Sequence, residues 1–200
     1  MAIVVEHDKR KREILEKSLD VFAKEGYEDV TFQKIADRCG ITRTTLYFYF
    51  KNKRDIFLAA LKQLLSEMEI EIRNLVSDES ISAEETLRKV MMIIVGYCEQ
   101  NINMFSVLLV YLIQLKKAGV DTDERVRRRV VKLRHLMTTV IIRGIKNNEF
   151  GVTDVHQINE LLYGIVEAAI FRVAILNQTD ISKIRTTINL AIDGILKKSK

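Results

Sequence analysis

The chain contains no proline among its 200 residues and only eight glycines. These two residues most often end regular elements and build tight turns, and an all-β fold needs many of them. Their scarcity therefore favours long helices. Hydrophobic residues make up 48% of the chain and charged residues 30%, a balance typical of soluble globular proteins. A chain of this length can form one large or two small domains with a hydrophobic core.

Apolar residues recur with helical periodicity along almost the whole sequence. Polar residues that can cap a helix precede several of these stretches, among them Thr31, Thr42, Asn52 and Asp154. We therefore predict an all-α fold of about nine helices. The expected segments are one that includes 14–22 and ends at Gly26, followed by 32–38, 43–50, 52–76, 82–101, 104–117, 121–148, 154–177 and 180–198. The β-branched run 140–142 keeps the helical spacing of its neighbours, so we assign it to a helix.

The excess positive charge lies in one N-terminal segment. Residues 9–54 hold twelve Lys and Arg against seven Asp and Glu, whereas the rest of the chain has twenty of each. Eight of the fourteen aromatic residues lie between Phe22 and Phe57. Such a segment suits a polyanion such as DNA, although a solvated basic surface fits the same counts. The basic run 9–12 is either an arm toward DNA or a disordered tail, and the run 125–134 fits a solvated helix face.

Other classes of protein find little support in the sequence. No run of about 18 apolar residues predicts a membrane span, and the charged N-terminus lacks the apolar core of a secretory signal. The two cysteines, Cys39 and Cys98, form no disulfide framework, which favours the cytoplasm. The three histidines show no metal-ligand spacing, and neither a glycine-rich phosphate loop nor a nucleophile elbow occurs. We predict no enzyme activity, metal or cofactor.

Residues 30–50 have the pattern of a helix-turn-helix. Ala36 is small where two helices would cross, and Gly40 stands where the turn needs a positive φ. Ile35, Ile41 and Leu46 would form the small core between the helices. Because Thr42 would cap the second helix, the first turn of that helix would point outward, where this motif meets base edges in the major groove.

This segment resembles the DNA-binding domain of the TetR family of bacterial transcriptional regulators. The resemblance covers roughly Arg12 to Leu61 and rests on Phe22–Tyr27, Val30–Thr31, Ile35–Ala36, Cys39–Ile41, Thr45–Phe50 and Lys51–Lys53. It implies a DNA-binding domain at 1–52 and a helical effector-binding and dimerisation domain at 53–200. The implied function is a repressor that binds a palindromic operator in double-stranded DNA as a homodimer. A small apolar or amphipathic effector would release it. The alternative is a helical ligand carrier that binds no DNA.

The resemblance also implies roles for single residues. Thr31, Tyr47 and Lys53 would contact phosphates, with Lys51 nearby, and Arg43 would bind a guanine through two hydrogen bonds. Thr42 and Thr44 would approach bases, and Tyr49 a sugar, phosphate or base. The implied DNA-binding set is Thr31, Thr42, Arg43, Thr44, Thr45, Tyr47, Tyr49, Lys51 and Lys53. We assign Phe50, and in part Phe48, to packing.

The rest of the chain has no diagnostic motif. A homodimer interface is expected in the last two helices, with Leu161, Leu162, Ile165, Ala169 and Ile192, although these residues also suit an ordinary core. Candidate residues of an effector pocket are Tyr97, Met104, Phe105, Leu108, Tyr111, Gln114, Met137, Ile141, Glu167 and Phe171, although such apolar stripes also suit a core. Glu167 and Arg172 are charged within apolar runs, so we expect them to be buried with partners, in the pocket or at the dimer interface.

Overall fold

The computed structural model describes residues 2–120, 124–176, 178 and 180–197, without the side chains of residues 2–5, 125, 126 and 129. The predicted helix ends at 121, 177 and 198 lie outside these residues. The described chain forms helices and one isolated bridge, between Phe150 and Leu196. The helices are α1 (Ala2–Asp29), α2 (Phe32–Cys39), α3 (Arg43–Tyr49), α4 (Lys53–Ser77), α5 (Ala83–Gln100), α6 (Ile102–Lys117), α7 (Glu124–Lys146), α8 (Val155–Ala174) and α9 (Ser182–Ile195). The predicted all-α fold is confirmed, and residues 140–142 are helical within α7.

The helices form two compact units. Unit 1 comprises Met1–Glu67 and Ser106–Asp121, and unit 2 comprises Met68–Phe105 and Thr122–Lys200. Helices α4 and α6 each contribute residues to both units. This division describes contacts, whereas the predicted boundary at residues 52 and 53 is one of function and stays a prediction. In the described part of the chain, no helix by itself has the length and apolar composition to cross a membrane, and α5 and α6 pass that test only as a bent pair.

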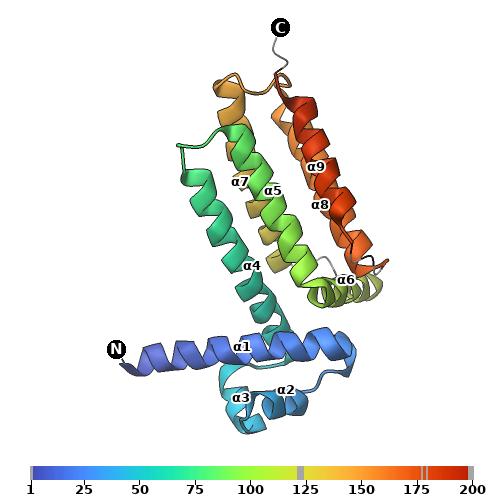
Figure 1. The fold of residues 1–200 in the computed structure, drawn as a ribbon. Coiled ribbons are helices and arrows are strands. Elements are labelled where there is room, and N and C mark those ends of the chain that lie inside the picture. Colours follow the sequence, from blue (N-terminus) through green and yellow to red (C-terminus); the bar gives the residue numbers. More distant parts are fainter. Residues whose placement is uncertain (1, 121–123, 177, 179, 198–200) are drawn as a thin grey trace. The chain divides into compact units, whose positions relative to one another are not determined.

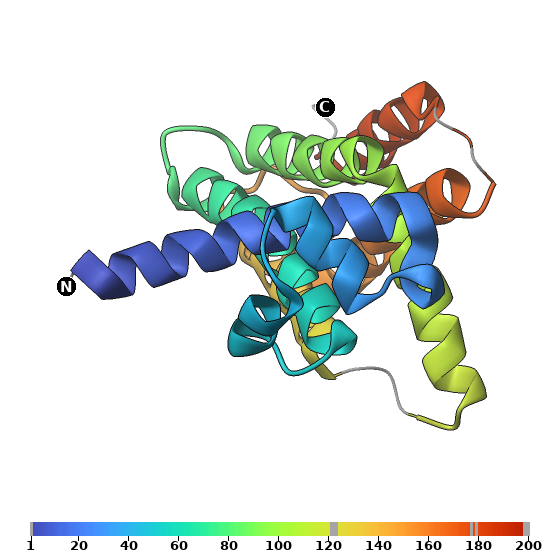
Figure 2. The ribbon, with the colours of Figure 1, turned by 90° about the horizontal axis from the view of Figure 1, so that it is seen from below.

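Unit 1 is built around the three N-terminal helices (Figures 1 and 2). Gly26, with φ 77°, interrupts α1 near its C-terminal end, at the position where the sequence predicts a helix end. The run 9–12 is helical within α1, so the alternative of a disordered tail is wrong, whereas a contact of this run with DNA stays a prediction. No helix breaker occurs in this run. Arg10 and Glu13, which lie about one helical turn apart, form an ion pair at 3.1 Å that stabilises the helix.

Unit 2 contains a bundle in which α5 packs against α7, α8 and α9 (Figure 1). The facing sides of these helices are fully buried and apolar, with Met91 and Ile94 from α5, Met137 and Ile141 from α7, Leu162 and Ala169 from α8, and Ile188 and Ile192 from α9. Each helix is thus held by its apolar stripe, as the helical periodicity of the sequence predicts.

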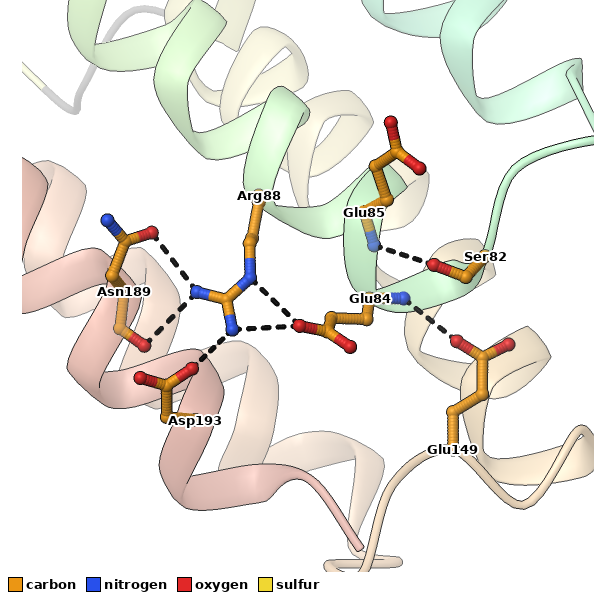
Figure 3. A network of polar contacts seen from close by, with 7 residues as sticks. All are labelled: Ser82, Glu84, Glu85, Arg88, Glu149, Asn189 and Asp193. Carbon is orange, nitrogen blue, oxygen red and sulfur yellow. Dashed lines mark hydrogen bonds and ion pairs between the residues drawn. The ribbon is translucent and has the colours of Figure 1, made fainter.

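A polar network ties the start of α5 to its neighbours (Figure 3). Ser82 caps α5 by accepting the Glu85 N–H at 3.1 Å, and a Glu149 carboxylate oxygen accepts the Glu84 N–H at 3.0 Å. The Arg88 guanidinium is the centre of the network. It donates to the Glu84 carboxylate at 2.9 and 3.1 Å on its own helix, and to the Asn189 amide oxygen and the Asp193 carboxylate on α9. One side chain therefore joins α5 to α9.

Replacing Arg88 by alanine is expected to destabilise unit 2. The change leaves two carboxylates without their cation and removes the charged hydrogen bonds between α5 and α9, so we expect a loss of about 1–3 kcal/mol in the free energy of unfolding. Urea unfolding followed by circular dichroism measures it. Lys89→Ala is the matched control, because Lys89 pairs with Glu85 along its own helix and its loss should change stability by less than about 0.5 kcal/mol. Equal losses for both variants would contradict the role given to Arg88.

Candidate nucleic-acid interface

The turn between α2 and α3 has the geometry of a helix-turn-helix. Thr31 caps α2 by accepting the Lys34 N–H at 3.3 Å, and Gly40 ends α2 in the left-handed region with φ 68°. Two residues later Thr42 caps α3 by accepting the Thr45 N–H at 3.1 Å. A side chain at Gly40 would be strained in this conformation. The turn therefore fixes the direction in which α3 leaves α2.

The small core under the turn is the predicted one. Ile35, Ala36 and Leu46 are fully buried, while Ile41 is half-buried. Burial raises the pKa of the buried Cys39 thiol above its usual value, so this cysteine behaves as an apolar core residue. Since Leu46 is the buried residue of α3, the opposite side of that short helix is left for solvent or a partner.

The first turn of α3 is exposed. The side chains of Thr42, Arg43, Thr44 and Thr45 are all at the surface. The Thr42 and Thr45 hydroxyls lie 2.8 Å apart, within hydrogen-bond distance. Arg43 and Thr44 therefore carry the polar groups of this turn that the cap does not use.

Arg43 and Tyr47 form one structure on the outer face of α3. Arg43 donates a hydrogen bond to the Tyr47 hydroxyl at 3.0 Å, and its guanidinium lies 5.4 Å from the centre of the Tyr47 ring. The ring of Tyr47 in turn stacks on Phe32, with centroids 4.5 Å apart. Because Phe32 follows Thr31 directly, these contacts bring the predicted residues Thr31, Arg43 and Tyr47 to neighbouring positions.

Phe48 differs from its predicted packing role. Its side chain is 76% exposed, whereas Phe50 is buried as predicted. The neighbouring Tyr49 is half-buried, because its ring stacks on that of His7 from α1 with centroids 4.8 Å apart. The His7 ring also meets the edge of Phe48 at 6.0 Å. Sequence analysis missed His7, and only the continuation of α1 to Ala2 places it beside α3.

Lys51, just before α4, and Lys53, the first residue of α4, differ in their surroundings. Lys51 is exposed. Lys53 is half-buried and donates a hydrogen bond to the Glu28 carbonyl oxygen at 2.9 Å. An ammonium group has three donors, so this bond leaves two of them for a phosphate.

Several acidic side chains of unit 1 contact groups outside α3. Asp20 pairs with Arg38 at 2.8 Å, Glu25 pairs with Lys34, and Asp37 accepts a hydrogen bond from Gln33. The two ion pairs neutralise part of the negative charge of unit 1, and α3 itself contains Arg43 and no acidic residue. The outer face of α3 is thus suited to an anionic surface.

The predicted pocket residues fall into three groups. Tyr97 lines an open groove of about 660 Å³ between α4 and α5 in unit 2. Met104, Phe105, Leu108, Tyr111, Met137 and Ile141 are buried, and Gln114 is half-buried. Glu167 and Phe171 are exposed on α8. The groove is lined by Glu71 and Leu75 from α4 and by Lys89, Met92, Ile93, Gly96, Tyr97 and Gln100 from α5.

The expectation that Glu167 and Arg172 are buried is wrong, because both are exposed on α8. Of the predicted interface residues, Leu161 is exposed, whereas Leu162, Ile165, Ala169 and Ile192 are buried within unit 2. The apolar runs of α8 are long enough to cover both faces of the helix. One face fills the core of unit 2, and the other presents Leu161, Gly164, Ala168, Phe171 and Ile175 to the surface.

Comparison with known proteins connects this geometry to a family. Residues 14–60 match the family model described as "Bacterial regulatory proteins, tetR family", and this range includes the turn and all of α3. A fatty acid metabolism regulator protein of Bacillus subtilis is 22% identical over 163 residues, which cover 79% of this chain and 80% of that protein.

Three solved structures share the fold over nearly the whole chain. A TetR transcription regulator from Haloarcula marismortui superposes with a TM-score of 0.83 at 24% identity, covering 95% of this chain and all of that one. The regulator FadR from Bacillus subtilis in complex with stearoyl-CoA gives 0.72 at 18% identity, with coverages of 90% and 95%. A regulator from Saccharomonospora viridis in complex with choline gives 0.80 at 19% identity, with coverages of 96% and 100%.

The helix-turn-helix geometry, the match of residues 14–60 and the shared fold agree with the resemblance found in the sequence. Residues 14–60 therefore form a DNA-binding domain of the kind described for the TetR family, and the chain is similar to proteins named as transcriptional regulators.

Proposed function

We propose that the chain binds a palindromic operator as a homodimer and releases it when a small effector binds. The observation that carries the proposal is the exposed first turn of α3, where Arg43 and Thr44 stand outward beside Tyr47. In a helix-turn-helix these positions meet base edges in the major groove. The proposed phosphate contacts are Thr31, Tyr47, Tyr49, Lys51 and Lys53, and Thr42 and Thr45 hold the turn from which Arg43 and Thr44 project.

Phe48 joins this set as a proposed contact. A phenylalanine that is 76% exposed is unfavourable in water, and it lies on α3 one turn after Thr44. An apolar side chain at this place suits the methyl group of a thymine.

The proposed boundary between a DNA-binding domain and an effector-binding domain lies between residues 52 and 53. It follows from the same proposal, since all proposed base and phosphate contacts except Lys53 precede α4.

The proposed homodimer uses the outer faces of α8 and α9. On α8 the exposed face carries Leu161 and Phe171, and on α9 it carries Leu190, whose side chain is 71% exposed. These two helices pack against each other within unit 2. Two copies of such a helix pair form a four-helix interface with two-fold symmetry. A two-fold dimer presents two recognition helices to half-sites about 34–36 Å apart or a multiple of this spacing.

The proposed effector site is the groove between α4 and α5. Leu75, Met92 and Ile93 give it apolar walls, and Lys89 gives it a cation, so it suits an amphipathic molecule with an acyl chain and an anionic head. The relatives of this chain include regulators of fatty acid metabolism and one structure with stearoyl-CoA. The choline bound by another neighbour is the competing class, which Glu71 and Tyr97 would accept.

Filling the groove tests this site. Gly96 lines it, and no atom lies within 4 Å of where a Cβ would stand, so Gly96→Leu is expected to fold at least as well, since leucine favours helices more than glycine. We expect Gly96→Leu to leave operator affinity unchanged and to weaken operator release by stearoyl-CoA about tenfold or more. Titration of the protein–DNA complex followed by fluorescence anisotropy measures both.

Gly96→Ala is the matched control, because one methyl group leaves most of the groove open. Choline serves as the second probe. Release by choline and not by stearoyl-CoA would replace the acyl class by a cation. If both variants release DNA like the parent chain, the groove is not the effector site.

DNA binding itself is tested by titrating a pool of duplexes at increasing salt. The proposal predicts that specific binding weakens steeply as salt rises, because phosphate contacts release counterions. A carrier protein without DNA binding would show no such dependence and no preference among duplexes. We propose no catalytic role for any residue.

A further inference from the structure

Tyr27 lies directly against the ammonium group of Lys53. Gly26, with φ 77°, breaks α1 immediately before Tyr27 and turns the chain out of the helix direction. The Nζ of Lys53 lies 4.7 Å from the centre of the Tyr27 ring, a cation–π distance. The same Nζ donates to the carbonyl oxygen of Glu28, the next residue, at 2.9 Å. The short segment after the helix break thus holds the lysine head from two sides.

The Tyr27 ring is itself fixed by an aromatic cluster within unit 1. Its centroid is 4.9 Å from that of Tyr111, 5.2 Å from Phe57 and 6.0 Å from Phe22. Tyr111 belongs to the part of α6 that packs in unit 1, and it is buried, as are the two phenylalanines. Burial, and secondarily Tyr111, raises the pKa of Tyr27 to about 12. The phenol is therefore neutral at physiological pH.

A lysine on a flexible stem loses much rotamer freedom when it binds one phosphate. A lysine whose head is already held near one position loses less, and binds more tightly for that reason. The contacts with Tyr27 and Glu28 hold Lys53 in this way while leaving two N–H groups free of the Glu28 carbonyl. The ring face of Tyr27 thus holds the Lys53 ammonium in place, and the ring of Tyr111 packs against Tyr27 and holds it in turn.

We infer that Tyr27 is a positioning residue for the contact of Lys53 with a DNA phosphate, and that Tyr111 of α6 holds Tyr27 in that role. The inference rests on the proposed DNA binding of this chain. The helix break at Gly26 and the cluster of Phe22, Tyr27, Phe57 and Tyr111 would then place the ring that contacts the Lys53 ammonium. A displacement of Tyr111 would move this ring, because the rings of Tyr111 and Tyr27 are in contact.

The test combines Tyr27→Leu, Tyr27→Phe and Lys53→Ala in a double-mutant cycle on operator affinity. We expect Tyr27→Leu to weaken binding about 2- to 5-fold per half-site, the range for a surface cation–π contact. We expect Tyr27→Phe to restore it, since the ring face remains. Lys53→Ala should weaken binding and reduce the slope of log affinity against log salt by about one per half-site. Tyr27→Leu should add nothing to Lys53→Ala, because both remove the same contact.

Two controls separate positioning from folding. Ile14→Val removes a methyl group from a buried side chain of α1 outside the aromatic cluster, so it should lower thermal stability and leave the salt slope unchanged. Tyr111→Leu should reproduce the effect of Tyr27→Leu, again without adding to Lys53→Ala. Additive losses for Tyr27→Leu and Lys53→Ala would overturn the inference, as would a Tyr27→Phe variant as weak as Tyr27→Leu.

The cycle also distinguishes this inference from the proposed function. If the parent chain shows no preference for any duplex, the proposed function fails before the cycle begins. If the parent binds an operator and Lys53→Ala leaves both affinity and slope unchanged, the positioning inference alone is overturned.

Discussion

Replacing Phe171 by aspartate is expected to convert the proposed dimer into a monomer. Phe171 is 53% exposed at the centre of an apolar face on α8, together with Leu161 and Ile175. Burying a phenylalanine side chain stabilises an interface by about 1.5–3 kcal/mol. In a two-fold dimer each copy carries the substitution, so the interface loses this contribution twice. The variant also places two uncompensated carboxylates in the interface. Analytical ultracentrifugation measures the change in mass.

The same variant is expected to weaken operator binding about 10²- to 10⁴-fold, because linking two half-site contacts in one dimer raises the apparent affinity by that factor. Val131→Asp is the matched control, since Val131 is comparably exposed on α7, outside the proposed interface. A Phe171→Asp variant that keeps the mass and affinity of the parent chain, as Val131→Asp should, would show that the face on α8 is not the interface.

Replacing Arg43 by alanine is expected to relax the base preference of the protein. A bidentate contact between arginine and guanine contributes about 1–3 kcal/mol of discrimination, and a dimer loses two of them. The preferred guanine position in each half-site should therefore tolerate all four bases, while binding to random DNA changes little. Competition between operator and single-base variants, at fixed salt, measures the discrimination directly.

Two further variants sharpen this prediction. Arg43→Lys keeps the charge and loses the planar fork, so it should behave like Arg43→Ala at the guanine position. Lys51→Ala removes an exposed cation and should weaken all sequences alike while reducing the salt slope. Equal losses on every sequence for both Arg43→Ala and Lys51→Ala would contradict the division into base and phosphate contacts. The free energy of unfolding should change by about 1 kcal/mol or less, because the contacts of Arg43 with Tyr47 lie at the surface.

Most of the fold follows from local features of the sequence. Caps at Thr31, Thr42, Ser82 and Asp154 are seen where capping residues precede apolar periodicity. Gly26 and Gly40 adopt the positive φ that their places between helices require. These are interactions within a few residues, and such interactions are encoded locally.

Contacts between segments that are distant in the sequence could not be predicted from it. The charged N-terminus was expected as an arm or a tail, and only its helical continuation reveals the stack of His7 on Tyr49. The contact of Tyr27 with Tyr111 joins α1 to α6, and no periodicity predicts it. Tertiary packing decides such contacts, and it leaves no short-range signal.

The C-terminal candidates show why apolar runs are ambiguous. Helix α8 is apolar around most of its circumference, so the sequence does not tell the side in the core from the side at the surface. Ala169 is buried and Phe171, two residues later, is exposed, as successive helical positions on different faces require. Glu167 and Arg172 flank the exposed face, which explains how charges fit within an apolar run without burial.

Selection from a pool of randomised duplexes by the 200-residue chain at low salt, followed by sequencing, tests operator binding directly. A homodimer that binds an operator should enrich a palindrome whose half-sites are about 10 base pairs apart or a multiple of this. Selection by the Arg43→Ala variant should lose the preference for one guanine in each half-site. If the parent chain enriches no sequence from the pool, it does not bind a specific operator.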